Sequence, residues 1–523
     1  MSSHLTRRRA VGIIGAAALV AGGYKGAELA ADPVGDKDCG PTTPMSSSQA
    51  AAEDTSLPWR LKGGVVNDVS CLSRTAVHGV VAVKTEADIA NSLAYARTNG
   101  LKVSAFGARH SMGGQAFAPN GVVLDMTGFN AISLNAEAMT VTVQSGVRWH
   151  DIQNAIHPRF AVKAMQSSDV FTVGGSISVN AHGMDHHVGA IERTIKWLRV
   201  MLADGSIQRV SRSENVELYR HVVGGYGLFG VILDCELEIA PNTVYESQRQ
   251  LITLAAFPDL WAKQLEHNDE IGLFYGHLST SPGSFLDELL IYTYHKTDVS
   301  PDNLPPLAEI GSVAPRRLIF NLAKQGSLLE RLKWSSEKNL EHRFESCTVS
   351  EIAKVTGEAC LVSRNEPMHD SVPYLFNDLQ YETDILHEYF VPRDKLVPFV
   401  EAMRGVFAEH HTLLLNASIR VVHQEDIALN YAPQEAFSVV LYINQRVDDE
   451  GIARMKAVTS ALIDLADSFG GRFFLPYQKF YDVKQLVRAY PMIADVYAKR
   501  AAYDPQGLFT NNFAETYGPL LKA

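Results

Sequence analysis

The most informative part of the sequence is Lys102-Val103-Ser104-Ala105-Phe106, followed at once by Gly107-Ala108-Arg109-His110-Ser111 and then by Gly113-Gly114. The first five residues predict a short strand that leads into a turn. Glycine tolerates unusual backbone angles and lets another group approach the chain closely. The turn therefore predicts a place where successive backbone N–H groups gather around a ligand.

Strands and one helix surround this turn. Thr85 followed by Asp88 predicts the start of a helix, and Gly100 predicts its end. A second glycine-rich loop reads Thr172-Val173-Gly174-Gly175-Ser176. Apolar runs predict strands over residues 80–83, 102–106, 122–126, 140–144, 198–202, 206–210 and 231–239. Residues 75–241 are therefore predicted to form one α+β unit with two glycine loops between its strands.

The run Gly225-Tyr226-Gly227-Leu228-Phe229-Gly230 fits the pattern GxGxxG. A dinucleotide-binding site of the Rossmann type needs a strand before this pattern and a helix after it. Residues 231–237 alternate like a strand instead, so the helix N-terminus that would bind a pyrophosphate is missing. The run is interpreted as a glycine-rich turn packed closely against something flat.

Four motifs, in this order, resemble the FAD-binding domain of the vanillyl-alcohol-oxidase family, also called the PCMH type. They are Gly107-Ala108-Arg109-His110-Ser111, Thr172-Val173-Gly174-Gly175-Ser176, His182-Gly183 and Gly227-Leu228-Phe229-Gly230-Val231-Ile232. The members that the chain resembles most are alditol oxidases, aldonolactone oxidases and decaprenylphosphoryl-ribose oxidases. The resemblance covers residues 75–241 well and the C-terminal tail less well.

The resemblance implies FAD as cofactor, because glycine turns can neutralise its pyrophosphate without cationic side chains. The residues that it assigns to FAD binding are Gly107, Ala108, Arg109, His110, Ser111, Val173, Gly174, Gly175, Ser176, His182, Gly183, Gly230 and Ile232.

In the family, the histidine at the position of His110 bonds through a ring nitrogen to the 8α-methyl group of the flavin. The resemblance therefore implies a covalent flavin, and the alternative is a histidine packed beside the ring. Some relatives add a cysteinyl bond from the second loop, but that position is Val170 here. A second covalent bond is not expected.

His182, His186 and His187 form a histidine cluster. Zinc or iron can use such residues, but no neighbouring Cys or Glu completes a convincing ligand set. The decaprenylphosphoryl-ribose oxidases carry a similar stretch on the flavin loop. We therefore expect a flavin loop here and no metal site.

Residues 242–475 are predicted to form a second, α+β substrate domain with an antiparallel sheet. Strands are expected over residues 289–294, 413–422 and 439–443, and a helix over residues 394–408 with Asp394 as its N-cap. Residues 315–338 are basic and amphipathic, which suits either contact with a membrane surface or a helix packed on the substrate domain. Residues 476–523 resemble the family's closing segment, which returns to the FAD domain.

Three residues beyond the first domain are candidates for catalysis. Arg420, in Ala417-Ser418-Ile419-Arg420, resembles an alditol-oxidase arginine, although Ser418 replaces the glutamate found there. A fixed cation can stabilise a developing alkoxide, and a structural ion pair is the alternative. Tyr477 matches an essential lysine of the decaprenylphosphoryl-ribose oxidases when residues are counted from Gly470-Gly471-Arg472, and Lys479 follows two residues later. In an extended strand both side chains share one face, so either can remove a hydroxyl proton.

The resemblance implies hydride transfer from a carbinol carbon of a sugar, polyol or aldonolactone to the flavin, with oxygen or a quinone as electron acceptor. A dehydrogenase acting on a lipid-linked sugar is one alternative. A flavin-binding carrier or structural module without turnover is another.

Composition and the N-terminus indicate the location of the protein. A formal net charge of −11 argues against a nucleic-acid partner, and five scattered cysteines define no disulfide framework. Residues 1–31, with Arg7-Arg8-Arg9 before a weakly apolar run, resemble a twin-arginine signal for export to the periplasm or cell surface. An uncleaved membrane anchor is the alternative. Residues 32–56 are predicted to be a linker, and the FAD domain then spans 57–241.

Overall fold

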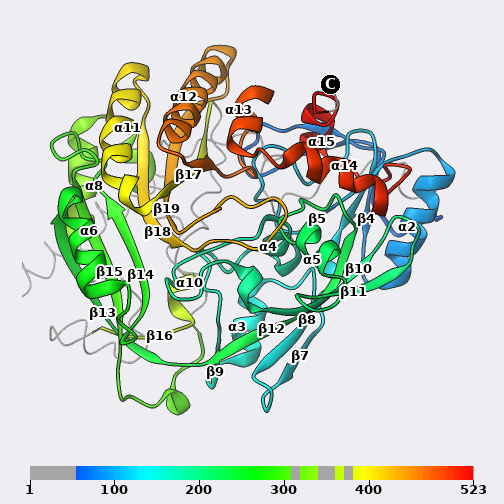
Figure 1. Cartoon of the computed structure of the whole chain (residues 1–523), viewed down its shortest axis with the longest axis horizontal. Coiled ribbons are helices and arrows are strands. Elements are labelled where there is room, and N and C mark those ends of the chain that lie inside the picture. The colour runs from blue at the N-terminus through cyan, green and yellow to red at the C-terminus, as the bar shows by residue number, and fades with distance from the viewer. Residues whose placement is uncertain (1–54, 308–318, 340–359, 370–380, 522–523) are drawn as a thin grey trace, which may run out of the picture.

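The computed structural model describes residues 55–307, 319–339, 360–369 and 381–521. The predicted signal segment, residues 1–31, and nearly all of the predicted linker lie outside the described residues. In the described part, helices and mostly antiparallel sheets combine into the α+β fold that the sequence predicts (Figure 1).

The first sheet ends in the strand that leads into the glycine turn at residue 107. Its order is β1 (Trp59–Lys62), β4 (Gly79–Ala82), β6 (Val122–Asp125) and β5 (Val103–Phe106). The pairs β4–β6 and β6–β5 are parallel, so crossovers are needed between them. One is α2 (Glu86–Thr98), which begins with the predicted capping box of Thr85 and Asp88.

The second sheet carries the other motifs. Its main path is β11 (Ile207–Val210), β10 (Ile195–Met201), β12 (Val231–Pro241), β8 (Thr140–Gln144) and β7 (Ile132–Asn135), and β9 (Phe160–Val162) also pairs with β12. The GxGxxG run lies between α5 (Val216–Val222) and β12. A helix precedes it and a strand follows it, which is the reverse of a Rossmann site.

The third sheet, here called the cap sheet, is antiparallel and has eight strands. Its order is β16 (Leu361–Ser363), β13 (Val244–Thr253), β15 (Glu288–Lys296), β14 (Ile271–Leu278), β18 (Leu414–Val422), β19 (Ala436–Arg446), β17 (Glu382–Pro392) and β20 (Arg472–Phe473). Helices α11 (Leu396–His410) and α12 (Asp449–Ser468) pack together on its outer face (Figure 1). The other face is turned toward the two N-terminal sheets.

The chain ends beside the first sheet. After α13 (Val483–Ala489) and α14 (Ile493–Tyr503), the Val103 N–H donates to the Leu508 carbonyl at 2.8 Å and the Thr510 N–H donates to the Val103 carbonyl at 3.0 Å. Helix α15 (Asn512–Tyr517) follows. Figure 1 shows these C-terminal helices next to β4 and β5.

Three local expectations are wrong. The second glycine loop is the start of helix α4 (Val173–Val179), because the Thr172 side chain caps it. Asp394 is not an N-cap, since residues 393–395 form a 3-10 turn and α11 begins after Lys395. The strand that contains Arg472 ends at Phe473, so Tyr477 and Lys479 do not lie on a strand. Separately, Cys360 is disulfide-bonded, a bond that the spacing of the cysteines did not predict.

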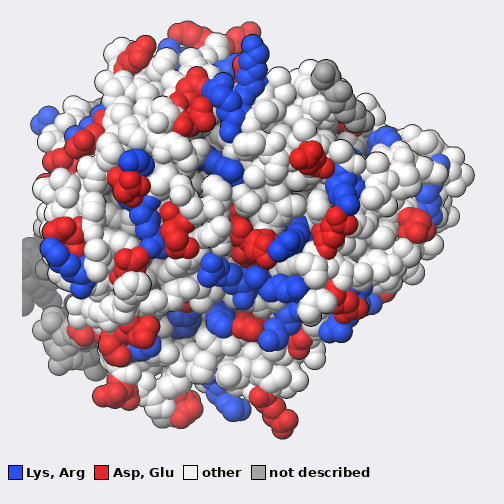
Figure 2. Space-filling view, viewed as in Figure 1, with Lys and Arg blue, Asp and Glu red and all other residues white. Residues whose placement is uncertain are grey.

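The surface carries both signs of charge. On the face shown in Figure 2, basic and acidic side chains are interspersed. Ion pairs at the surface include Arg220–Asp426 and Arg488–Asp464. Among the described residues, no helix is long and apolar enough to cross a bilayer.

A buried ion pair joins the cap sheet to the N-terminal unit. Arg364, just after β16, places Nη2 2.5 Å from Asp185 Oδ2, and both side chains are buried. The same guanidinium donates to the Lys163 carbonyl at 3.0 Å and to the Tyr245 hydroxyl at 3.1 Å. Burial alone would raise the pKa of Asp185, but the charge and hydrogen bond of Arg364 hold that pKa below its usual value.

We predict that Arg364→Met lowers the free energy of unfolding at neutral pH by about 3–5 kcal/mol, because Asp185 keeps a buried charge without its partner. Since the pKa of Asp185 is depressed in the folded state, this stabilisation is present above about pH 4 and is lost as the pH falls further. The difference in the free energy of unfolding between Arg364→Met and the wild type should therefore become smaller in acid. Urea denaturation at pH 7 and at pH 3 measures the difference in free energy of unfolding between the variant and the wild type.

The matched control is Arg404→Met, whose half-exposed guanidinium lies 3.3 Å from Asp287. It should cost less than about 1 kcal/mol. Equal losses in the two variants would contradict the prediction.

Candidate active site

A cavity of about 1030 Å³ lies between the N-terminal sheets and the cap sheet. This is the upper end of the range for small-molecule sites. The cavity lining includes most of the predicted cofactor residues, namely Gly107, Ala108, Arg109, His110, Ser111, Gly174, Gly175, Ser176, His182, Gly230 and Ile232. Val173 and Gly183 do not line it, because Val173 is buried in the core and Gly183 packs on the Met165 backbone.

The first glycine turn fits closely against the second motif. A Cβ atom added at Gly107 would lie 1.8 Å from Thr172 Oγ1, so no side chain fits there. Arg109 has a φ of 59°, the left-handed region that non-glycine residues seldom adopt. This backbone brings residues 107–111 to the cavity wall.

The N–H groups of Gly113 and Gly114 bind other parts of the protein and do not point to the cavity as ligand donors. The Gly113 N–H donates to Gln115 Oε1 at 2.9 Å, and the Gly114 N–H donates to Asp68 Oδ2 at 3.0 Å. A Cβ at Gly113 would meet the Tyr477 carbonyl at 2.5 Å. The expectation that these two glycines approach a pyrophosphate is therefore wrong, and they let the C-terminal segment approach the turn.

The second motif also packs closely against a neighbouring segment of backbone. The Gly174 N–H donates to the Ser145 carbonyl at 2.8 Å, and a Cβ at Gly174 would lie 2.7 Å from Ser145 Cβ. Ser176 Oγ donates to Gln166 Oε1 at 2.9 Å. Glycine is thus required where α4 starts at the cavity.

His110 lines the cavity and is half-buried. Its ring packs edge-on against Phe171, with 4.5 Å between the ring centroids. Burial, together with the positive charge of Arg109, lowers the pKa of His110 to about 3. The imidazole is therefore neutral at pH 7, and one ring nitrogen carries a lone pair.

The cap sheet faces the cavity with a row of four residues from neighbouring strands, three of them polar. Strand register places His277 opposite Ser418, Ser418 opposite Val440, and Val440 opposite Glu388. Directly opposed residues point to the same face of a sheet. All four residues line the cavity.

Glu388 is the centre of a buried polar network that the sequence analysis missed. His182 Nε2 lies 2.5 Å from Glu388 Oε1, and Ser438 Oγ donates to the same oxygen at 2.5 Å. The Tyr477 hydroxyl donates to Glu388 Oε2 at 3.3 Å. The signal in the sequence was an acidic residue within the apolar strand 385–391, since buried carboxylates are rare unless paired.

Charge fixes the protonation states of this network. Burial would raise the pKa of Glu388, but His182, Ser438 and Arg420 together hold it below its usual value. Burial and the Glu388 charge raise the pKa of Tyr477 far above its usual value. At neutral pH the site therefore holds a carboxylate next to a neutral phenol.

The other two catalytic candidates, Arg420 and Lys479, lie in different places. Arg420 lines the cavity beside Glu388. Lys479 is not in the lining, because its Nζ donates to the Asn512 carbonyl and to Thr516 Oγ1, both at 2.9 Å. The expectation that Tyr477 and Lys479 share one pocket is wrong, since the segment that carries them is not a strand.

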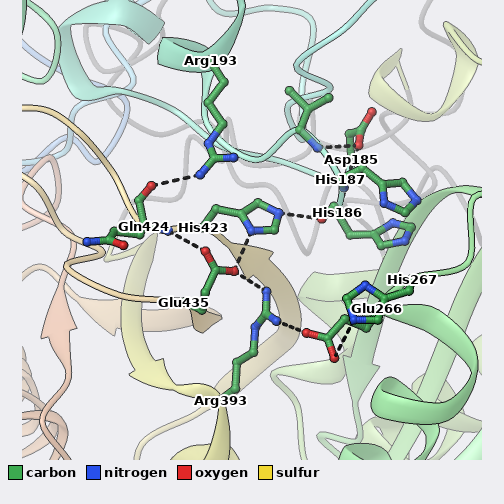
Figure 3. Close-up of polar contacts among 11 residues, drawn as sticks. Asp185, His186, His187, Arg193, Glu266, His267, Arg393, His423, Gln424 and Glu435 are labelled. Carbon is green, nitrogen blue, oxygen red and sulfur yellow. Dashed lines mark hydrogen bonds and ion pairs between the residues drawn. The ribbon is translucent and has the colours of Figure 1, made fainter.

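The three histidines do not gather at one point: the His186 and His187 rings lie side by side, with 3.9 Å between centroids (Figure 3), and His182 lies at the cavity. His182 contacts Glu388, His187 Nε2 lies 3.0 Å from the Ile271 carbonyl, and the His186 ring packs against Trp261 and Phe274. Within residues 55–307, 319–339, 360–369 and 381–521, no three His, Cys, Asp or Glu side chains are grouped to hold a metal ion.

Part of the basic amphipathic segment forms a lid over the cavity. Residues 308–318 lie outside the described residues, but Phe320 and α8 (Ser327–Asn339) contribute to the lining. Lys324 Nζ is buried 2.8 Å from Asp384, and Lys333 Nζ is buried 2.5 Å from Glu337. Two of the basic residues are therefore paired inside the protein.

Residues 77–211 match the family model described as FAD binding domain. The chain carries an FAD-binding domain of the PCMH type. The matched range contains the first three motifs, and the fourth, which begins at Gly227, lies beyond its end.

Three curated relatives each match about a third of the chain or less. The chain is 34% identical over 173 residues to an uncharacterized oxidoreductase of Rhodococcoides fascians, ORF5 in the fasciation locus. The match covers 33% of this chain and 39% of that protein. The chain is 33% identical over 155 residues to cytokinin dehydrogenase 5 of Arabidopsis thaliana, covering 28% of this chain and 29% of that protein. Decaprenylphosphoryl-beta-D-ribose oxidase of Mycolicibacterium smegmatis is 30% identical over 151 residues, covering 28% of this chain and 33% of that protein. The chain thus spans well under two thirds of each relative.

The residues of the FAD-binding domain fit the cofactor. There is no room for a side chain at Gly107 or Gly174, so backbone atoms form the wall at this end of the cavity. Thr172, Gly175 and Ser176 lie where α4 begins, and helix N-termini favour anions such as a pyrophosphate.

We predict that Gly107→Ala lowers the flavin content of the purified protein, because the new methyl group collides with Thr172 and displaces the cap of α4. Overpacking of this kind costs about 1–3 kcal/mol. The ratio of flavin to protein absorbance measures the change. Gly283→Ala is the control, since a Cβ there meets nothing within 4 Å. A full flavin content in Gly107→Ala would show that the turn does not shape the cofactor site.

Proposed function

We propose that the protein is an FAD-dependent oxidoreductase that oxidises a carbinol group of a sugar, polyol or aldonolactone. One observation carries the proposal. The Glu388 carboxylate, hydrogen-bonded by Tyr477, lies in the cavity that the FAD-binding motifs also line. A proton acceptor and a cofactor site therefore share one enclosed space.

In this proposal the substrate hydroxyl approaches Tyr477. The phenol donates its own proton toward Glu388, so its oxygen is free to accept the hydroxyl hydrogen. Glu388 is the final proton acceptor, and His182 and Ser438 hold it in place. Arg420 stabilises the alkoxide as it forms. FAD, when bound, supplies the hydride acceptor for the carbinol carbon.

Two other functions are tested against this one. An amine substrate is considered because one relative is named a cytokinin dehydrogenase. A flavin carrier without turnover is the second. Mixing the protein anaerobically with polyols, sugar lactones and alkylamines separates them, because only the true substrate class bleaches the flavin. No bleaching with any compound favours the carrier.

We predict that Glu388→Gln and Tyr477→Phe slow anaerobic flavin reduction by the substrate, each on the order of 100- to 10,000-fold. FAD should stay bound, since neither residue belongs to the glycine turns. Lys479→Met is the matched comparison, and its flavin should be reduced at the wild-type rate, because the Lys479 ammonium group of the wild type lies outside the cavity. Stopped-flow absorbance of the flavin measures the rates. Slow reduction only in Lys479→Met would assign the proton to that lysine instead.

A sugar with an apolar tail is a second candidate substrate, because the lid is apolar. Ile319, Leu322, Leu329 and Leu332 line the cavity, and Leu328 and Leu332 are 68% and 55% exposed. A lipid-linked sugar presented at a membrane surface would meet this lid. Alkyl glycosides that reduce the flavin at far lower concentration than the free sugar would favour this candidate. The electron acceptor, oxygen or a quinone, is part of the same proposal.

We propose further that His110 bonds covalently to the flavin. Its neutral ring lies in the cavity beside the FAD-binding motifs, which supports this assignment.

We predict that acid precipitation of the wild-type protein leaves the flavin on the chain and that His110→Ala releases it into the supernatant. His267→Ala, whose side chain is 88% exposed, is the control and should retain the flavin. Flavin that leaves the wild-type chain in acid would refute the bond and leave the FAD site intact.

We also propose export through the N-terminal segment. The paired arginines Arg7-Arg8 support it, and the disulfide at Cys360 suits an oxidising compartment. A membrane-anchored form is the alternative.

We predict that replacing Arg7 and Arg8 by lysine keeps the precursor in the cytoplasm, because the twin-arginine route requires the pair. Cell fractionation followed by immunoblotting measures the distribution. An Arg9→Lys variant is the control. Unchanged fractionation of the double variant would exclude this route.

A further inference from the structure

Three polar side chains lie together on two neighbouring strands of the cap sheet and are here called the distal cluster. Asn416 and Ser418 come from β18, His277 comes from β14, and all three line the cavity. Asn416 and Ser418 are two residues apart on one strand, so they share a face. His277 is directly opposite Ser418 in the strand register, so it points to the same face.

The distal cluster is not paired within the protein. In the part of the chain that the structure describes, none of the three side chains makes a hydrogen bond to another residue, and His277 Nδ1 is buried without a partner. A polar group shielded from water is costly unless it is hydrogen-bonded. The three side chains therefore leave hydrogen bonds that a ligand in the cavity can satisfy.

The chemistry of the distal cluster suits hydroxyl groups. The Asn416 amide, the Ser418 hydroxyl and a neutral imidazole each donate and accept hydrogen bonds. Burial, together with the positive charges of Lys333 and Arg420, lowers the pKa of His277 to about 3, so its ring is neutral at pH 7. A sugar hydroxyl also donates and accepts, whereas ionised carboxylates and phosphates are acceptors.

The two cations that act on His277 each have a carboxylate nearby. Lys333 Nζ lies 2.5 Å from Glu337 Oε1. The charge of Arg420 acts on Glu388 and helps to hold the pKa of that carboxyl group down. The positive charges beside the distal cluster are therefore largely offset, which favours a neutral ligand group there over an anionic one.

Strand order sets how far the distal cluster lies from the catalytic carboxylate. From Glu388 on β17, the register passes through Val440 on β19 and Ser418 on β18 to His277 on β14 (Figure 1). Neighbouring strands are about 4.8 Å apart, so Ser418 lies about 10 Å and His277 about 14 Å from Glu388 along the sheet. One sugar ring does not span that distance, whereas two linked rings do. Val440 is apolar, so the two polar ends of the row are separate contact points.

Aromatic rings border the distal cluster. The Tyr275 ring lines the cavity, lies 5.1 Å from the His277 ring and stacks on Tyr292 with 4.6 Å between centroids. Phe320 of the lid lines the same cavity, with Lys333 Nζ 5.1 Å from its ring. Apolar rings with a few convergent polar groups are typical of small-molecule sites. A sugar ring, which has apolar faces and a polar edge, fits such surroundings.

We propose that the distal cluster is a subsite for a second, neutral sugar unit, and that the substrate is a disaccharide or a longer glycoside whose reacting ring meets Tyr477 and Glu388. The role of the subsite in turnover rests on the proposed function, whereas the binding of the second sugar unit does not. Asn416, Ser418 and His277 determine specificity, because they contact only a sugar long enough to extend from β17 to β14.

Isothermal titration calorimetry of the oxidised holoprotein tests the subsite without turnover. Glucose and galactose are compared with cellobiose, lactose and maltose. At least one disaccharide should bind about tenfold or more tightly than either monosaccharide, because each net hydrogen bond contributes roughly two- to tenfold in affinity. Anaerobic flavin reduction with the same sugars then gives the limiting rate and the half-saturating concentration.

Two variants assign the effect to the distal cluster. His277→Phe keeps a ring and removes its hydrogen bonds, and Ser418→Ala removes one hydroxyl group. Each should weaken binding of the preferred disaccharide about three- to tenfold and raise the half-saturating concentration by the same factor, with the loss in affinity and not in the limiting rate. His295→Phe, on the neighbouring strand and outside the cavity lining, is the control and should keep the wild-type affinity. If His277→Phe does not fold, Ser418→Ala decides.

Disaccharides that bind no more tightly than monosaccharides, or a preference that survives in both variants, would overturn the subsite. Tighter binding of glucose 6-phosphate or of octyl glucoside than of every disaccharide would overturn the choice of a neutral sugar unit. A disaccharide that binds through the distal cluster without reducing the flavin would sustain the subsite and contradict the proposed function.

Discussion

A carboxylate taken out of water has to be paired, and Glu388 finds its partners in three separate parts of the chain. His182 comes from the FAD-binding domain, Ser438 from a neighbouring strand of the cap sheet, and Tyr477 from the segment that follows the sheet. Removing one partner of a buried ion pair costs about 3–5 kcal/mol. This network therefore holds the two halves of the cavity at one distance, and the same groups are those that a substrate hydroxyl would meet.

Close backbone contacts at the glycine turns also support the arrangement of the cavity. Gly107 touches Thr172, and Gly113 touches the backbone of Tyr477. Neither contact leaves space for a side chain, so the first motif, the second motif and the C-terminal segment are locked together at the cavity wall. The glycines position protein against protein at least as much as protein against cofactor. The loop between β18 and β19, residues 423–435, adds another contact between the two parts, because Asn180 at the end of α4 donates to its Glu425 side chain.

Much of the fold could be predicted from local pattern. The capping box at Thr85, the strands around residue 107, and the strand after Gly230 all form as expected, because each depends on neighbours in the sequence. The rejection of a Rossmann site rested on the same kind of evidence. Local pattern failed where a long-range contact decided. The second glycine motif is helical because Thr172 caps it, and the segment after Phe473 leaves the sheet to reach the first turn.

By itself, the sequence determined the α+β class, which follows from glycine, capping and alternation within short windows. Its resemblance to the PCMH-type family supplied the order of the FAD motifs and most of the residues that line the cofactor end of the cavity. Only the tertiary structure decided which acid and which base meet. Glu388 reaches the cavity because β17 pairs in register with β19, which fixes the face its side chain takes. Lys479 turns away because Asn512 and Thr516, more than thirty residues later, bind its ammonium group. Strand register and contacts between distant segments are set by the packing of the whole chain, and a single sequence carries no local mark of either.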